Sequence, residues 1–416
     1  MSKRQFSFIS NSLSKGQFIG AFFKTCLFQG KRSLSESKEI LSDYFGVIER
    51  HIFFFGAGRM SVYTVLKSLQ LTSSDEVVVA GYTCVVLTNA VKFAGCKVRY
   101  VDVDEETLNL NKDQLFAAIS EDTKAVIVPH NFGLAFEDIK EIKSRHPEII
   151  IIEDVAHSFG SKNQLGEFCG TIGDVGFFSL EYSKPLTTGL GGILFVNNES
   201  LLERVDLEYN ALGITLKGTA LKMIFTLGAL NMWYFLSTTF FQRMAMKVLQ
   251  ILRLNYKTSA QEISGELPAG YPVRMHPMLG SLLVLQLRQL DKINKKKQEI
   301  VLEYESIFSS FNTLRSYPVQ NQVMVRYPIV FSDAVSDETI EKVKEEAIRR
   351  GIQFGFWFND VVHPRGSFRY CYSSGDCPSG EKISQRILNL PVNIHARLSR
   401  DTLNEISELF NSHGVH

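Results

Sequence analysis

Two short apolar runs near the middle of the chain constrain its fold most strongly. Residues 149–152 are β-branched, which is typical of a strand covered on both faces, and the run ends in Glu153 and Asp154. Residues 175–179 form a second apolar run after a glycine-rich connection. Parallel α/β sheets bind ligands at the carboxyl ends of their strands. The sequence therefore predicts a parallel sheet with a ligand site beside the two acids.

A lysine follows the second run almost directly. Lys184 lies between this predicted strand and the turn sequence TTGLGG at 187–192. A solvating charge is out of place between two buried segments. Partial desolvation there lowers the pKa of an amine, as Schiff-base chemistry requires. Taken singly, Asp154, His157 and Lys184 could equally be a helix cap, a satisfied histidine and a surface lysine.

The order of four residues along the chain favours the catalytic interpretation. Asp154, His157, Ser179 and Lys184, followed by TTGxGG, resemble the DegT/DnrJ-type sugar aminotransferases, which use pyridoxal 5′-phosphate (PLP) and have fold type I. The resemblance implies that Lys184 holds the cofactor aldehyde and that Asp154 keeps the pyridinium nitrogen protonated. It also implies that the Ser179 hydroxyl binds the phosphate and that His157 lies beside the ring. We therefore expect a large α/β domain with a mainly parallel sheet flanked by helices, and a smaller C-terminal α+β domain.

A glycine turn, FFFGAGRMS at 53–61, precedes a predicted helix. Backbone N–H groups and the helix dipole at such a start suit a phosphate. The resemblance assigns Gly58, Arg59 and Met60 to the cofactor phosphate through their backbones. A dinucleotide fingerprint is the rival interpretation, but no G-x-G-x-x-G is completed here.

Two positions depart from the family pattern. Relatives often have an aromatic ring, stacked on the cofactor, where this chain has Cys84, so we expect His157 and an apolar neighbour to hold the ring instead. The sequence GYPVRM at 270–275 stands where relatives commonly have GYNYRM, and Pro272 offers neither a side-chain donor nor an N–H. Arg274 is retained and is expected to help bind the cofactor from across a dimer interface.

Apolar runs alternate with helical patterns from residue 76 onward, which predicts βα units. We expect an arm at 1–33, a large cofactor-binding domain at 34–255 and a smaller domain at 256–416. The resemblance implies that the smaller domain closes over the substrate. The smaller domain should contain short strands, such as one at 323–331, and helices at 276–310, 337–350, 380–389 and 400–412.

Several features of the last third admit two readings. The basic run at 292–297 is most simply a solvated helix face. Arg326, Trp357 and His363 are candidates to line the substrate cleft, although each could equally serve packing or lie at the surface.

Composition excludes some classes of partner. With 45 basic and 44 acidic residues, the chain has no global field that would attract nucleic acid. Its six cysteines are scattered without metal-ligand spacing, so we expect reduced thiols, a cytosolic location and no metal.

Two segments stand apart in charge. Residues 1–33 are basic and rich in Phe, contain no acid and lack the features of a secretory signal. Residues 223–242 carry no charge over a length that matches a bilayer span. For the first segment we expect an arm packed on the fold or on a partner subunit, with contact to an anionic membrane as the alternative. For the second we expect a buried helix or dimer contact, with docking on a membrane surface and a true span as alternatives.

The resemblance implies a homodimeric enzyme that moves an amino group from glutamate or glutamine to a keto sugar, attached to a nucleotide, for polysaccharide biosynthesis. Lys184 would then be the covalent anchor and also the general acid and base. A PLP-dependent sugar dehydratase is one alternative, but its relatives replace this lysine with His. A non-catalytic regulator or membrane-associated scaffold is the other, kept open by Cys84, Pro272 and the uncharged segment.

Overall fold

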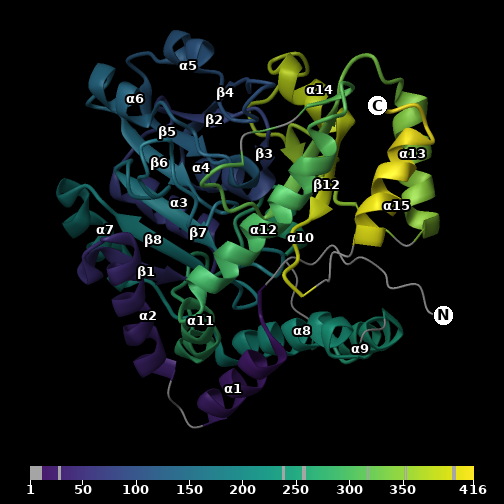
Figure 1. Ribbon diagram of the computed structural model, residues 1–416. Coiled ribbons are helices and arrows are strands. Elements are labelled where there is room, and N and C mark those ends of the chain that lie inside the picture. Colours follow the sequence, from purple (N-terminus) through teal and green to yellow (C-terminus); the bar gives the residue numbers. More distant parts are fainter. Residues whose placement is uncertain are drawn as a thin grey trace.

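The computed structural model describes residues 12–26, 30–236, 239–254, 259–315, 317, 319–350, 352, 354–395 and 400–416. A seven-stranded sheet and its helices form one part of the molecule, and a three-stranded sheet with the C-terminal helices forms the other (Figure 1). The mixed α/β architecture, with a mainly parallel central sheet, confirms the predicted fold class.

The large sheet has the strand order β1-β8-β7-β6-β5-β2-β4. The strands from β4 to β7 run parallel, whereas β8 is antiparallel to both β7 and β1. Their bounds are β1 (Ile52–Phe55), β2 (Glu76–Ala80), β4 (Lys97–Val101), β5 (Thr123–Pro129), β6 (Ile150–Asp154), β7 (Val175–Ser179) and β8 (Gly192–Val196).

Alternation along the strands divides the apolar side chains between two cores. In β2, Val77 and Val79 belong to one core, and Val78 and Ala80 belong to the other. Successive side chains of a strand point to opposite faces, so a run that is apolar throughout needs cover on both sides. The first core takes in α3 (Gly58–Ser68), α4 (Val85–Ala94) and α7 (Glu199–Ala211), and the second takes in α5 (Lys112–Ala118) and α6 (Ile139–Arg145).

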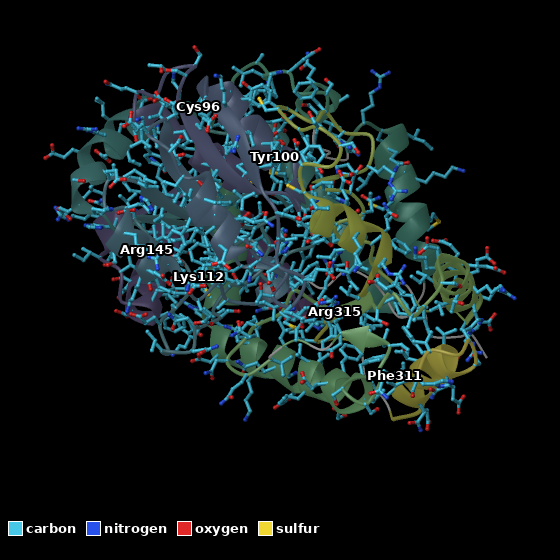
Figure 2. All side chains as sticks on the ribbon, turned by 90° about the horizontal axis from the view of Figure 1, so that it is seen from above. Cys96, Tyr100, Lys112, Arg145, Phe311 and Arg315 are labelled. Atoms are coloured by element: carbon cyan, nitrogen blue, oxygen red, sulfur yellow. The ribbon has the colours of Figure 1, made fainter. Side chains whose placement is uncertain are left out.

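The second core continues into the C-terminal part. Its sheet has the order β12-β10-β9, with β9 (Leu314–Arg315), β10 (Arg326–Phe331) and β12 (Ile387–Pro391). Its helices are α12 (Leu290–Phe308), α13 (Asp337–Arg350), α14 (Pro378–Arg386) and α15 (Arg400–Asn411). Arg315, labelled in Figure 2, forms ion pairs with Glu105 and Glu106 that follow β4, and so joins the two parts.

Two predicted helices were wrong in extent. The segment 276–310 divides into a short 3-10 turn, α11 (Gly280–Leu287) and α12. The break follows from packing, because α11 is buried against the N-terminal helices whereas α12 crosses to the second core. The segment 380–389 stops being helical at Arg386, since its last apolar residues pair with β10 as β12.

The basic run at 292–297 is only partly solvated, which corrects the sequence reading. Lys297 is fully buried, and its amine donates a hydrogen bond to the Val392 carbonyl oxygen at 2.9 Å. It falls on the inner face of α12 with Ile293 and Ile300, three or four residues away along the helix. Burial lowers the pKa of Lys297 to about 7.

The N-terminal segment and the uncharged segment pack together. Helices α1 (Lys15–Cys26) and α2 (Gly30–Phe45) both contact α11, and α1 also contacts α8 (Lys217–Leu236). Leu13 and Ala21 are buried, so the described portion of the arm packs on the fold. Helix α9 (Thr239–Ile251) folds back on α8 to form a hairpin at one end of the molecule (Figure 1).

The predicted uncharged stretch at 223–242 is therefore divided between two helices. Residues 237–238 between them, like 1–11 and 27–29 of the arm and the predicted boundary at 255, lie outside the described residues. Among the residues that are described, no helix combines the length and apolarity that a membrane crossing needs. The predicted division into domains stays a prediction.

A small ladder joins the two parts near the end of the large sheet. β3 (Thr83–Cys84) pairs in parallel with β11 (Val362–His363), and the Thr83 N–H donates to the Val361 carbonyl oxygen at 2.8 Å. The chain between Trp357 and His363 is thereby held against the carboxyl ends of the large sheet's strands.

Candidate active site

A cavity of about 270 Å³ lies where the parallel strands end and the C-terminal part covers them. The predicted residues that line it are Gly58, Arg59, Cys84, Asp154, His157, Ser179 and Lys184. Trp357 and His363, proposed for the substrate cleft, line it too. Met60 and Arg274 are not among its lining residues, and sequence reasoning missed Glu181 and Phe358.

Lys184 presents a buried amine to this cavity. Its side chain is only 9% exposed, and its Nζ lies 4.5 Å from the centre of the Trp357 indole. Burial lowers the pKa of Lys184 to about 8, although Glu181 and Asp154 act in the opposite direction. A substantial fraction of this amine is therefore neutral near physiological pH, as nucleophilic chemistry requires.

Asp154 faces the cavity from the end of β6. One carboxylate oxygen accepts a hydrogen bond from the Ala156 N–H at 3.0 Å. Burial raises the pKa of Asp154, and the Ala156 N–H and the Lys184 charge offset only part of that effect. A cationic partner in the cavity would therefore stabilise the ionised carboxylate.

The neighbouring acid has a structural role instead. Glu153 is fully buried on the other face of β6, and its carboxylate accepts N–H groups from Gly170, Ile172 and Gly173 at 2.6 to 2.8 Å. It also contacts His130 Nε2 at 3.0 Å. Strand alternation thus divides the acid pair, so that one carboxylate organises a loop and the other reaches the site.

His157 is held as a neutral ring. Its Nδ1 accepts a hydrogen bond from the Phe132 N–H at 3.3 Å, which leaves the ring proton on Nε2. Burial lowers the pKa of His157 well below the usual histidine range, with the Lys184 charge adding to the effect. The imidazole stacks on Trp357 with ring centroids 5.3 Å apart. Cys84, the residue before α4, also lines the cavity, and burial raises the pKa of its thiol, which favours the neutral form.

The start of α3 and the end of β7 form an anion cradle. Ala57 at the helix N-cap supplies no side-chain cap, and Gly58 lines the cavity beside Ser179. Ser179 pairs with Gly192, where an added Cβ would lie 2.5 Å from the Gly58 nitrogen. The last glycine of the TTGLGG turn is thus needed for this close approach. The Met60 N–H donates to the Ala57 carbonyl oxygen at 3.1 Å, and the phosphate contact predicted for Met60 stays a prediction.

Comparison with known proteins identifies the family. A profile of the DegT/DnrJ/EryC1/StrS aminotransferase family matches residues 27–411, nearly the whole chain. The chain belongs to this family. It is thus a PLP-dependent aminotransferase of fold type I, as the resemblance implied.

The similarity of this chain to individual proteins extends over different shares of its length. GDP-perosamine synthase of Escherichia coli O157:H7 is 35% identical over a match spanning 35% of this chain and 40% of that protein. The structure of Helicobacter pylori PseC, an aminotransferase of pseudoaminic acid biosynthesis, aligns with a TM-score of 0.72 at 18% identity and covers 98% of this chain and 99% of that one. E. coli GDP-4-keto-6-deoxy-D-mannose-3-dehydratase with bound hydrated PLP aligns with a TM-score of 0.72, also at 18% identity, over 97% and 98% of the two chains.

The aminotransferase cavity suits PLP in the chemistry of its donors. Asp154 and Lys184 line the same cavity. A cation there would stabilise the ionised carboxylate of Asp154, and the lowered pKa of Lys184 favours its neutral amine. The helix start at Gly58 and the Ser179 hydroxyl lie on the same cavity wall and suit a phosphate. These four groups match the pyridinium, the aldehyde and the phosphate of the cofactor.

A buried ion pair stabilises the first turn of α3. Arg59 donates two hydrogen bonds to the Glu262 carboxylate, from Nε and from Nη2, and the second is 2.7 Å long. The side chains of Arg59 and Glu262 are both buried. Glu262 lies in α10 (Ala260–Ile263), and its carbonyl oxygen also accepts from Asn89. Tyr271, from the GYPVRM motif, donates its hydroxyl to the Arg59 carbonyl oxygen at 3.2 Å. The side chain of Arg59 therefore holds the first turn of α3 against α10.

Arg274, from the same motif, lies away from the cavity. Its main chain bridges to Phe55 and Ile214, and its guanidinium carbon lies 5.5 Å from the centre of the Tyr209 ring. Within one chain this arginine therefore supports the edge of the large sheet.

Arg326 lies behind Trp357 and does not line the cavity. Its guanidinium carbon is 3.4 Å from the centre of the Trp357 ring, and the residue is fully buried on β10. Burial lowers the pKa of Arg326, with Glu181 acting in the opposite direction. The indole thus separates this cation from the cavity.

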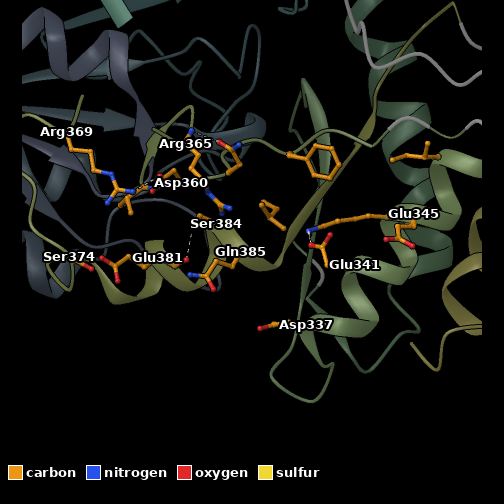
Figure 3. Close-up of a pocket in the computed structure, with 16 residues that line it drawn as sticks. Asp337, Glu341, Glu345, Asp360, Arg365, Arg369, Ser374, Glu381, Ser384 and Gln385 are labelled. Atoms are coloured by element: carbon orange, nitrogen blue, oxygen red, sulfur yellow. Dashed lines mark hydrogen bonds and ion pairs between the residues drawn. The ribbon is translucent and has the colours of Figure 1, made fainter. Parts of the chain in front are cut away.

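A larger cavity of about 740 Å³ lies between α13 and α14, outside the active site (Figure 3). Its charged groups are largely engaged with one another, for example Arg369 with Asp360 at 2.6 Å and Lys344 with Glu341 at 2.6 Å. It contains none of the predicted site residues. The larger of these two cavities is therefore not the candidate active site.

Proposed function

We propose that this aminotransferase moves an amino group from glutamate or glutamine to a keto sugar attached to a nucleotide, for polysaccharide biosynthesis. The observation that carries the proposal is the pairing of Lys184 and Asp154 across one buried cavity. Support for a nucleotide-linked acceptor comes from the match to GDP-perosamine synthase.

When bound, PLP supplies an electrophilic aldehyde and a ring that accepts electrons. Lys184, whose pKa burial lowers to about 8 in the protein without cofactor, would anchor it, and the same amine would take and return a proton at Nζ. Asp154 holds a negative charge against the ring nitrogen. Gly58, Arg59 and Ser179 would bind the phosphate, and His157, with its proton on Nε2, would orient the ring.

Two measurements test the proposal. Borohydride treatment of the PLP-loaded protein, digestion and mass mapping should give a label on Lys184. Mass spectrometry of reactions with glutamate and a panel of nucleotide-linked keto sugars should give a product in which a carbonyl oxygen is replaced by nitrogen. A label elsewhere, or no label at saturating PLP, would refute the assignment of the lysine.

The alternatives give different results in the same assays. A sugar dehydratase would release an acceptor that has lost a hydroxyl and gained no nitrogen, and Lys184 disfavours it because the deoxygenating relatives have His there. A regulator or scaffold would stay colourless with PLP, or would not lose its colour when glutamate is added.

We also propose a homodimer, by analogy with other fold type I enzymes, in which Arg274 of each subunit serves the cofactor of the other. Mixed Lys184→Ala and Arg274→Ala proteins, unfolded and refolded together, should then regain part of the activity through hybrid dimers with one intact site. No recovery, in a protein that runs as a dimer by light scattering, would count against the shared site.

A cytoplasmic location is also proposed. The cysteines of the described residues are free thiols, namely Cys84, Cys96, Cys169, Cys371 and Cys377. Unpaired thiols are typical of a reducing compartment. Fractionation of cells that express the tagged protein would test the location.

A further inference from the structure

The hairpin of α8 and α9 belongs to the longest stretch of the chain without an acidic residue. No Asp or Glu occurs between Glu208 and Glu262, although acids and bases are almost equal in number over the whole chain. The basic residues of this stretch are Lys217, Lys222, Arg243, Lys247, Arg253 and Lys257. The sequence from Glu208 to Glu262, which includes the hairpin, is therefore cationic in a nearly neutral protein.

A second acid-free segment lies beside the first. Residues 1–35 contain no acid, and the part of them in α1 packs against α8. The contact is close, because a Cβ added at Gly228 would lie 2.9 Å from the Phe18 ring. Two segments without acids, far apart in the sequence, thus lie side by side at one end of the molecule (Figure 1).

Helix α9 turns large apolar side chains toward solvent. Met244, Val248, Ile251 and Leu252 are 47%, 47%, 71% and 58% exposed. Met244, Val248 and Ile251 lie on one face of the helix because they are spaced by four and seven residues, and Leu252 follows in the turn directly after it. We name these four side chains the apolar stripe. The exposed Lys247 lies at the edge of the stripe. An apolar stripe beside lysine, on the outer face of a helix, is typical of helices that lie in a membrane interface.

We propose that the apolar stripe of α9 docks flat on an anionic lipid surface, with Lys247 and Arg253 directed to the lipid phosphates. The apolar side chains would enter the boundary between headgroups and acyl chains, and the surrounding basic residues would be drawn to the negative leaflet. A second copy of the chain fits this surface less well. A twofold contact sets the same patch against itself, which would bring two basic surfaces together.

Vesicle co-sedimentation of the full-length, PLP-loaded protein tests the proposal. Vesicles of phosphatidylcholine with phosphatidylglycerol should bind the protein, binding should fall as salt is raised, and vesicles of phosphatidylcholine alone should bind much less. The double variant Val248→Ser/Ile251→Ser should lower the partition coefficient on anionic vesicles by about ten-fold or more. The variant Lys247→Glu should lower it several-fold.

A matched control comes from exposed apolar residues elsewhere. Leu302 on α12 and Ile348 on α13 are 57% and 70% exposed, so Leu302→Ser/Ile348→Ser removes similar side chains away from the hairpin. This control should bind vesicles like the parent protein. All variants should keep the parent's thermal midpoint, because the replaced side chains make few buried contacts.

Three outcomes would overturn the proposal. One is equal binding of the parent protein to anionic and neutral vesicles, including none to either. Another is an equal loss of binding in the stripe variant and the control variant. The third is a stripe variant that turns a dimer into a monomer in light scattering while the parent ignores vesicles, which would make the stripe an interface between copies. None of these outcomes depends on the proposed reaction.

Discussion

The indole of Trp357 lies parallel to the imidazole of His157, with ring centroids 5.3 Å apart and planes inclined by 9°. The same indole faces the Lys184 amine at 4.5 Å and the Arg326 guanidinium at 3.4 Å. One side chain of the C-terminal part therefore contacts the proposed covalent lysine, the histidine beside it and a buried cation. We expect Trp357 to limit the access of water to the Lys184 amine.

Replacing Trp357 with Ala should raise the pKa of Lys184 above its present value of about 8. Water admitted to the cavity favours the ammonium form, by about one pH unit or more. Loss of the cation–π contact acts in the opposite direction, but such contacts contribute only about 0.5 to 2 kcal/mol. Because only the neutral amine captures PLP, the capture rate of cofactor-free protein rises with pH through this pKa. The midpoint of that rise should shift upward in Trp357→Ala and stay in place in Trp357→Phe; an unmoved midpoint in both would contradict the prediction.

Asp154→Asn should separate cofactor anchoring from catalysis. The amide keeps an oxygen that can accept the Ala156 N–H, and only the charge is lost. We expect the reaction with glutamate to slow roughly a hundred- to a thousand-fold, the usual effect of removing one aligned electrostatic group. Borohydride should still label Lys184. Stopped-flow absorbance would measure the rate, and a variant as fast as the parent protein would disprove the role of the carboxylate.

Glu262→Gln should destabilise the cofactor-free protein and weaken PLP binding. It leaves the Arg59 guanidinium buried without its carboxylate, and breaking a buried ion pair from one side typically costs about 3 to 5 kcal/mol. Urea unfolding would measure the stability loss, and equilibrium dialysis would measure PLP affinity. The matched control is Glu338→Gln, which removes an exposed partner of Lys342 and should leave the unfolding midpoint in place. Equal effects of the two substitutions would contradict the bracing role of Glu262.

Lys297→Met should flatten the dependence of stability on pH. The folded-state pKa of Lys297 is lowered to about 7, so between that pH and its ordinary range near 10.5 the unfolded chain binds a proton that the folded chain does not. The free energy of unfolding therefore rises with pH over this window in the parent protein. Lys184 contributes with the same sign above about pH 8, and it is common to both proteins. Urea midpoints from pH 6.5 to 8.5 should rise less in Lys297→Met than in the parent or in Lys296→Met, which changes an exposed neighbour.

Much of the large domain followed from the sequence because its strands are covered on both faces. β7 spans the predicted run at 175–179, and β6 begins within the predicted run at 149–152 and ends at Asp154. The convergence of Asp154, His157, Ser179 and Lys184 could be anticipated from the rule that ligands meet strands at their carboxyl ends, and the family order supplied the roles.

The rest depended on contacts between distant segments. Nothing local distinguishes Lys297 from the solvated lysines beside it, since only the position of β12 decides which face of α12 is buried. Glu262 lies 203 residues from Arg59, so its pairing has no local signal, although it is the first acid after the long acid-free stretch. Trp357 could be named as a candidate, but its stacking on His157 required the fold of the C-terminal part.

The ladder between β3 and β11 limits how substrates come and go. Besides the Thr83 bond to Val361, the Phe358 N–H donates to the Tyr82 hydroxyl at 2.8 Å, so the Trp357 segment is tied at both ends to the rim of the large sheet. Swinging that segment outward would break main-chain hydrogen bonds as well as ring contacts. Substrates and products therefore either pass around a fixed indole or enter and leave only when the β3–β11 ladder opens. In the second case the opening of this ladder, and not the chemical step, limits the turnover rate.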